Sequence, residues 1–135
     1  MTEPEALHVW AREAMEKQIT SAADALACHC RKPRSAKRLH AARKALARLR
    51  AALEDLGTLA GAAPDFRERV WQLHRCAGKV RNADVLLDRI EGYREYAAQD
   101  ESEQLREVRA ALRKRRKRAR SELDRLLRKL PELRA

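Results

Sequence analysis

The chain has 135 residues, of which 44% are hydrophobic, 38% charged and only 4% aromatic. This length predicts one domain, over residues 1–135. Only four Gly and four Pro occur, and the apolar residues are mostly Ala and Leu, which argues against a β-sandwich or barrel and favours helices. No stretch approaches the roughly 18 apolar residues of a membrane span, and the acidic start does not resemble a signal peptide. We therefore expect a soluble, cytoplasmic protein without a membrane partner.

The charge balance gives the first indication of function. Lys and Arg number 31 and Asp and Glu number 20, which gives a net charge of +11. Arg outnumbers Lys, and its planar fork of donors suits phosphate oxygens better than a Lys point charge does. A small protein with this excess attracts polyanions. A high-GC genome and solvated helix faces produce the same composition without any ligand, so charge alone leaves both interpretations open.

Hydrophobic spacing predicts four helices joined by short breaks. The expected ranges are 5–30, 33–60, 64–96 and 100–130. Pro33 is placed in the first turn of the second helix, and Asp100 is the expected N-cap of the fourth, with Glu103 as its capping-box partner. Four long helices with short connections predict an all-α fold, an antiparallel up-down four-helix bundle.

The second helix carries a row of cations beside its apolar seam. Nine Lys or Arg residues and no acid occur from Arg31 to Arg50. At about 100° per residue, some of the polar residues flank the seam and others face further outward. The flanking residues are His40, Arg43 and Arg50, and the outward ones are Lys37, Lys44 and Arg48. A row half-shielded by packed side chains attracts an anion more strongly than an exposed row does.

The fourth helix is the most basic segment. From Leu105 to Lys129 there are 12 basic residues and only three acids, and residues 113–118 are six consecutive cations. Like charges four residues apart destabilise a helix, so we expect a bound anion to offset the repulsion. A solvated face or a nucleic-acid patch is the alternative. Four arginines share one flank at steps of four, three and four: Arg109, Arg113, Arg116 and Arg120.

Two further polar residues bear on the site. The cations around His40 should keep it neutral, and a bound polyphosphate would do the opposite, so that His40 donates to phosphate more strongly as pH falls. On the third helix Arg81 lies on the flank, while Asp84 falls within the apolar seam and must be paired there. Its expected partner is Arg43, Arg50 or Arg81. An orienting role at the site and an ordinary salt bridge without ligand remain open.

The cysteines do not predict a metal site or a disulfide framework. Cys28 and Cys30 point about 200° apart on a helix, so they would share a metal only if the chain unwound there. Cys76 stands alone, and the set is odd and sparse. We expect all three to act as small core residues, and we expect no metal and no cofactor.

Two stretches resemble the CHAD domain, the histidine-containing α-helical domain. Residues 39–53 resemble its signature helix, which has a His, an Arg three residues on, an Arg-rich tract and then Leu-Arg-Ala. Residues 78–87 resemble its second motif, Gly-x-x-Arg-Asp-x-Asp-Val. The order and separation of the stretches also fit. The sequence departs from the family pattern at Ala47, Glu54 and Asn82, and the missing Arg at 47 should weaken one phosphate contact.

The resemblance implies a helical protein that binds inorganic polyphosphate through a basic surface and has no catalytic activity of its own. Relatives are linked to triphosphate-processing domains or to polyphosphate granules. The first motif carries over to His40, Arg43, Arg48 and Arg50, and the second to Arg81 and Asp84. The family module is about twice as long, with two bundles related by approximate two-fold symmetry. This chain resembles one half, so a homodimer would supply the other.

We therefore expect a polyphosphate-binding groove lined by the second, third and fourth helices, with Asp84 and Asn82 as orienting residues. A nucleic-acid binder is one alternative, although the aromatic residues are not interleaved with the cation rows. An enzyme is another, a phosphatase or phosphotransferase or its accessory subunit, but Asp84 and Asp88 are the only carboxylate pair near Arg81. A helical adaptor that docks an acidic protein is the third.

Overall fold

The computed structural model describes residues 2–129, apart from the side chain of Asp100, and this part of the chain forms four α-helices and no strands. The all-α class and the number of helices expected from the sequence are confirmed. The helices are α1 (Glu3–Arg31), α2 (Ala36–Leu56), α3 (Pro64–Arg94) and α4 (Gln99–Leu127). The expected end of the last helix at residue 130 lies outside the described residues.

Local hydrogen bonds fix where α1 and α2 begin. The hydroxyl of Thr2 accepts from the backbone N–H of Glu5 while the Glu5 carboxylate accepts from the N–H of Thr2, a capping box that starts α1 two residues earlier than expected. The Ser35 hydroxyl accepts from the N–H of Arg38 at 3.2 Å, so α2 begins at Ala36. Pro33 therefore lies in the connecting turn and not in the helix, a correction to the expected range of 33–60.

The start of α4 also differs from the expectation. The helix begins at Gln99 with Ala98 at the N-cap and no side-chain cap, so the expected capping box between Asp100 and Glu103 is wrong. Arg94 ends α3 two residues before the expected limit. The hairpin is instead linked at this end by side chains, since the Tyr93 hydroxyl donates to the Glu101 carboxylate at 3.3 Å.

The connection between α2 and α3 requires glycine at two places. A Cβ at Gly57 would collide with the carbonyl oxygen of Leu53 and with the guanidinium of Arg67. Arg67 crosses there to donate to the hydroxyl of Thr58 at 3.2 Å. Gly61 has a φ of 72°, in the left-handed region that glycine adopts at no steric cost. These two positions allow α3 to turn back along α2.

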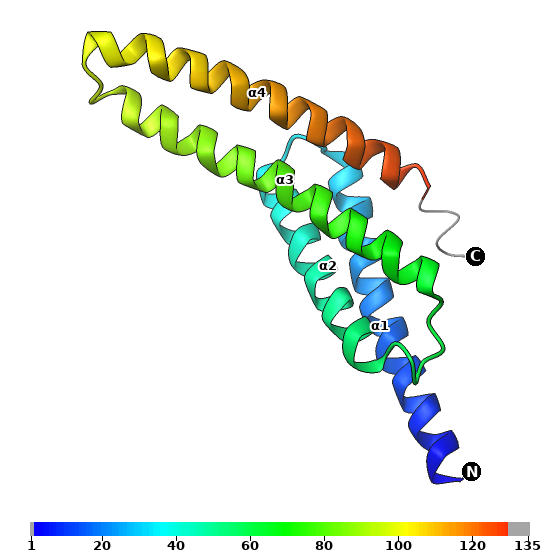
Figure 1. Cartoon of the computed structure of the whole chain (residues 1–135). Helices are drawn as coiled ribbons and strands as arrows, with labels where there is room; N and C mark the ends of the chain where they lie inside the picture. Colours follow the sequence, from blue (N-terminus) through cyan, green and yellow to red (C-terminus); the bar gives the residue numbers. More distant parts are fainter. Residues whose placement is uncertain (1, 130–135) are drawn as a thin grey trace.

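The helices form two hairpins that cross each other (Figure 1). Each helix packs mainly against its neighbour in the chain, α1 on α2, α2 on α3 and α3 on α4, while the other pairs touch only slightly. The closed up-down bundle expected from the sequence is therefore not confirmed. Five side chains fill the centre of the core and are almost fully buried: Leu39, Leu46, Val70, Val80 and Leu123.

Both hairpins project beyond the crossing (Figure 1). At the start of α1, Leu7, Val9 and Trp10 are exposed, and along the far half of the α3–α4 hairpin so are Leu86 and Val108. The helical spacing of Val108 to Leu112 and Ala119 predicts a core position, yet Val108 is 50% exposed, because only α3 runs along that half of α4 (Figure 1). Within residues 2–129, none of the helices combines the length and apolar character that crossing a membrane requires.

Candidate functional site

Cations and histidines from α2 and α3 lie together along one surface, which we call the basic α2–α3 face. Its residues are His40, Arg43, Lys44 and Arg50 on α2 and His74 and Arg81 on α3. Arg50 Nη1 lies 3.5 Å from His74 Nδ1. The positive charges of Lys44, Arg81 and Arg43 act on His40, so the α2 and α3 motifs predicted from the sequence are brought together.

The histidines of the basic α2–α3 face are held neutral. Burial lowers the pKa of His40, and Lys44, Arg81 and Arg43 lower it further. Burial, then Arg50 and Arg43, lowers the pKa of His74 in the same way. His40 Nδ1 and Arg43 Nε are buried without a hydrogen-bond partner among the described residues. The face is therefore positive and incompletely hydrogen-bonded, a state that an anion would relieve.

Glu54 pairs with a cation of this face. Glu54 lies 3.6 Å from Arg50, one helical turn further along α2, and the two side chains are 67% and 39% exposed. An exposed pair of this kind contributes little to stability, so it does not commit Arg50 to a structural role.

Gly78 leaves the α3 side of the face open. It follows His74 by four residues and precedes Arg81 by three, so the three share a flank of α3. A Cβ at Gly78 would meet no atom within 4 Å, which means that packing does not require glycine there. The small residue instead leaves the surface of α3 between His74 and Arg81 uncovered by a side chain.

Asp84 holds part of α4 in place. Its side chain is 9% exposed, and Oδ1 lies 3.3 Å from Arg116 Nη1 and 3.6 Å from Arg120 Nη2. The partners expected for Asp84 on α2 and α3 are wrong, because this part of the α3 seam packs against α4. A carboxylate that ties two guanidinium groups of another helix fits the orienting role predicted for it.

The arginines of α4 line a pocket rather than the basic α2–α3 face. The pocket encloses about 500 Å³ beside the α1–α2 turn, and we call it the turn pocket. Its charged or titratable lining residues are His29, Arg34, Arg113, Arg116, Lys117, Arg120 and Asp124. Three of the four arginines predicted on one flank of α4 thus come together here. The fourth, Arg109, lies 3.0 Å from Glu91 on the projecting half of the hairpin.

A single groove lined by all the predicted residues is not confirmed. The residues fall into the basic α2–α3 face and the turn pocket. Lys37 and Arg48 are exposed on the outer surface of α2. Asn82 is exposed and lines another pocket, between α3 and α4, together with Arg115 and Arg118.

Five residues of these groups were missed from the sequence: His74 on the basic α2–α3 face, and His29, Arg34, Lys117 and Asp124 in the turn pocket. His74 could have been found from the sequence, because its spacing to Gly78 and Arg81 places it on the flank of α3 that bears the second motif. Arg34 lies in a turn, where helical arithmetic gives no direction. Lys117 is one of six consecutive cations, so the sequence does not distinguish it from its neighbours. Only the packing of α4 places it in the turn pocket.

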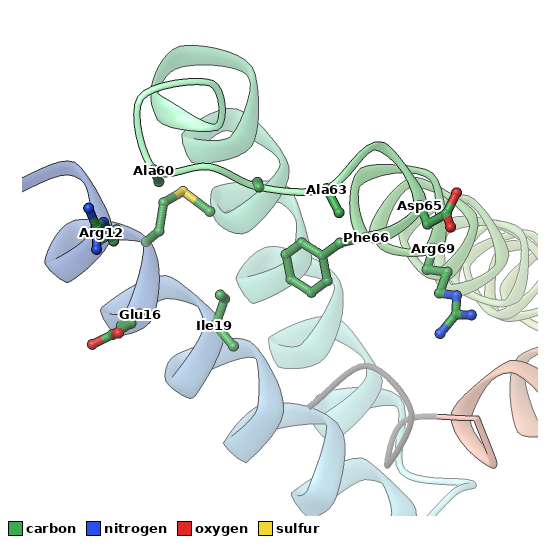
Figure 2. Close-up of a pocket in the computed structure, with 10 residues that line it drawn as sticks. Arg12, Glu16, Ile19, Ala60, Ala63, Asp65, Phe66 and Arg69 are labelled. Atoms are coloured by element: carbon green, nitrogen blue, oxygen red, sulfur yellow. The ribbon is translucent and has the colours of Figure 1, made fainter. Parts of the chain in front are cut away.

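A further pocket, between α1 and the start of α3, is different in character. Figure 2 shows Phe66 pointing from α3 toward Ile19 of α1, with Arg12, Glu16, Asp65 and Arg69 around the opening. The charges at its edge are mixed, so it does not favour an anion.

The three cysteines are free thiols, and they differ in how far they are exposed to solvent. Cys28 is half-buried, Cys30 is exposed and Cys76 is buried in the core. Burial raises the pKa of the Cys76 thiol, and the neighbouring Glu122 adds to the effect. Among the described residues, no group of three or more His, Cys, Asp or Glu side chains is placed to hold a metal ion.

Comparison with models of protein families matches the chain to the CHAD domain over residues 13–134, which is nearly its whole length. The match includes both motifs, the whole of α2 and α3, and all of α4 that the structure describes. No curated protein and no solved structure matched the chain.

We predict that Asp84→Asn lowers the free energy of unfolding by about 1–3 kcal/mol, because Arg116 and Arg120 lose the negative charge of their buried acceptor. Long-chain polyphosphate should raise the melting temperature more in this variant than in the parent, since an anion replaces the lost charge. Thermal and urea unfolding, with and without polyphosphate, measure both effects.

The matched control is Asp88→Asn, which removes the same charge from an exposed site one turn further along α3. Equal behaviour of the two variants would show that Asp84 acts only through net charge.

Proposed function

The chain belongs to the CHAD domain family, and we propose that it binds inorganic polyphosphate without catalysing a reaction. The observation that carries the proposal is the meeting of the two sequence motifs on the basic α2–α3 face. His40 of the first motif lies within electrostatic reach of Arg43 of the same motif and of Arg81 of the second, and all three belong to helices that pack together.

The chemistry of the face suits a string of phosphates. Guanidinium groups donate in pairs to phosphate oxygens, and Lys44 adds a mobile positive charge. Each neutralised phosphate releases counterions, so binding should weaken steeply with salt. His40 and His74 are neutral in the free protein. When a bound polyanion raises their pKa, each ring takes up a proton and can then donate to phosphate from both nitrogens.

The absence of catalysis is part of the proposal. Phosphoryl transfer generally uses metal-binding carboxylates beside the cations. Of the two carboxylates near Arg81, Asp84 is paired with Arg116 and Arg120, and Asp88 is exposed. This arrangement supports a binding module over a phosphatase, a phosphotransferase or an accessory subunit. Release of orthophosphate from polyphosphate with Mg²⁺ or Mn²⁺ would overturn this part of the proposal.

Nucleic acid is the second candidate ligand, and one observation favours it. Trp71 lines a pocket together with Arg50, and Arg75 lies 5.2 Å from the centroid of its ring. An aromatic residue therefore borders the basic α2–α3 face, although aromatic residues are not interleaved with the cation rows in the sequence, and it offers a stacking surface for a base. Competition separates the candidates, since polyphosphate should displace DNA far better than DNA displaces polyphosphate.

We also propose a homodimer, with the projecting half of the α3–α4 hairpin as its contact. Leu86 is 41% exposed and Val108 is 50% exposed, and both adjoin Leu112, which lies one turn from Val108 and lines the same pocket as Leu86. A second copy would cover apolar side chains that no helix of the same chain covers. A cytoplasmic location and an association with polyphosphate granules stay predictions.

The first test of the proposed function is Arg43→Ala combined with Arg50→Ala. We expect long-chain polyphosphate to bind at least tenfold more weakly, and the slope of log Kd against log salt to fall by about 1.5, because two phosphate contacts are lost. Calorimetric titration at several salt concentrations measures both quantities.

The control is Arg12→Ala combined with Lys17→Ala, two exposed cations on α1, outside the proposed dimer contact. It removes the same charge away from the face and should leave affinity within about twofold. Unchanged affinity in the Arg43 and Arg50 variant would exclude the basic α2–α3 face.

The second test concerns pH. Because the pKa values of His40 and His74 are lowered in the free protein, the unfolded state binds protons more readily, and stability should fall as pH drops below about 6.5. Polyphosphate raises both pKa values, so its affinity should increase over the same range, by up to about tenfold per pH unit for each proton taken up. Replacing both residues with Gln should flatten the pH profile, and an unaltered profile would contradict the proposed role.

The third test concerns the dimer. Light scattering should give twice the chain mass for the parent protein and the single-chain mass for Leu86→Glu combined with Val108→Glu, because buried carboxylates oppose association. Leu7→Glu combined with Val9→Glu alters the exposed apolar residues at the other end of the molecule and should leave the dimer intact. A monomeric parent would refute the proposal.

A further inference from the structure

We propose that the turn pocket binds a terminal phosphate group, one that carries close to two negative charges and three free oxygens. This inference rests on the proposed function, and it adds a second site that recognises the end of a phosphate chain. Free phosphate and pyrophosphate share the same terminal chemistry.

The charges of the turn pocket come from two separate segments of the chain. Arg34 belongs to the α1–α2 turn, and Arg113, Arg116, Lys117 and Arg120 belong to α4. These five cations face one lining carboxylate, that of Asp124. The positive charges of Arg116 and Arg34 both act on Arg120, which places the two segments within electrostatic reach of each other. Cations held this close repel one another unless an anion lies between them.

Buried atoms at the turn pocket lack hydrogen-bond partners. His29 is 3% exposed, and its Nδ1 finds no partner among the described residues. Arg120 Nε is in the same condition. Burial lowers the pKa of His29, with Asp124 opposing the shift and Arg120 reinforcing it. The pocket wall thus holds an imidazole nitrogen and a guanidinium nitrogen that have no hydrogen-bond partner among the described residues.

Asp84 prepares two of the cations for a ligand. Its contacts to Arg116 and Arg120 come from the α3 side, where its carboxylate is 9% exposed. Both arginine side chains are 28% exposed, so part of each guanidinium stays accessible. Fixing these long side chains before binding reduces the entropy lost when an anion arrives.

The charge of the pocket suits a terminal phosphate better than one within a chain. A phosphate with a single ester or anhydride link carries about −1.5 to −2 charges near neutral pH and offers three oxygens. A phosphate within a chain has a second link, one charge and two free oxygens. Five cations around about 500 Å³ match the denser of the two groups, whereas the open basic α2–α3 face suits a repeating one.

The two sites are close enough to serve one ligand. Arg81 of the basic α2–α3 face and Asp84, which holds Arg116 and Arg120, are three residues apart on α3. His40, near Arg81, follows Arg34 by six residues at the start of α2. A polyphosphate that lies along the face can therefore place its end in the turn pocket.

The experiment compares linear hexaphosphate, which has two ends, with cyclic hexametaphosphate, which has none. Calorimetric titration is carried out with the parent protein, with Arg34→Ala combined with Lys117→Ala, and with Arg31→Ala combined with Lys114→Ala. The second pair is the matched control, since it removes one Arg and one Lys from nearby exposed sites that do not line the turn pocket. Pyrophosphate is titrated as a separate arm.

We expect the parent protein to bind the linear ligand at least tenfold more tightly than the cyclic one. The Arg34 and Lys117 variant should lose that preference while its affinity for the cyclic ligand changes by less than threefold, and the control should keep the preference. Pyrophosphate that binds the parent as tightly as linear hexaphosphate, and depends on the same two residues, would identify a free diphosphate as the ligand of the pocket.

Equal affinity for the linear and cyclic ligands would overturn the terminal site and leave polyphosphate binding on the basic α2–α3 face intact. Failure of both hexaphosphates and of long-chain polyphosphate would instead overturn the proposed function. Pyrophosphate binding that required Arg34 and Lys117 would, in that event, still support the turn pocket as a phosphate site.

Discussion

The contact of Asp84 with Arg116 and Arg120 is the constraint on which the basic half of the molecule depends. It joins α4, the most highly charged helix, to α3 through a carboxylate that is 9% exposed. Ala119, Leu123 and Leu127 hold α4 on the core through apolar contacts. Asp84, within the apolar seam of α3, adds a negative charge that offsets part of the repulsion among the cations of α4.

The contact of Asp84 with the two arginines still leaves an excess of positive charge on α2, α3 and α4. Asp84 satisfies part of two guanidinium groups, while the cations of the basic α2–α3 face have Glu54 as their nearest paired acid, at Arg50. Burial and the neighbouring cations lower the pKa values of His40 and His74. The free protein thus keeps an electrostatic strain that the proposed polyanion would remove, and natural proteins accept such local conflict where they bind. The repulsion among these cations lowers the stability of the free protein, and the same repulsion would favour binding of the proposed polyanion.

The sequence predicted the local structure well because apolar spacing and Pro or Gly breaks act over a few residues. It placed four helices near their observed positions and put His40, Arg43 and Arg81 on helix flanks that do meet. It could not predict that the hairpins cross, because periodicity gives the buried side of a helix but not the neighbour that covers it. The partners of Asp84 were missed for that reason, as was the exposure of Val108. Arg34 was missed because it lies in a turn, where helical spacing gives no direction.

The α1–α2 turn has a consequence for how such proteins can diversify. Residues 32–35 connect two well-packed helices, yet Arg34 projects its charge toward α4 from outside any helix. The turn is anchored on both sides, by the Ser35 hydroxyl at the N–H of Arg38 and by the Arg38 guanidinium at the carbonyl of Cys28. An insertion of one or two residues there would leave the core unchanged and still move this cation by several ångströms. A change in the length of this turn, rather than a substitution within the helices, is therefore the simplest way in which related chains would come to prefer ligands of different size.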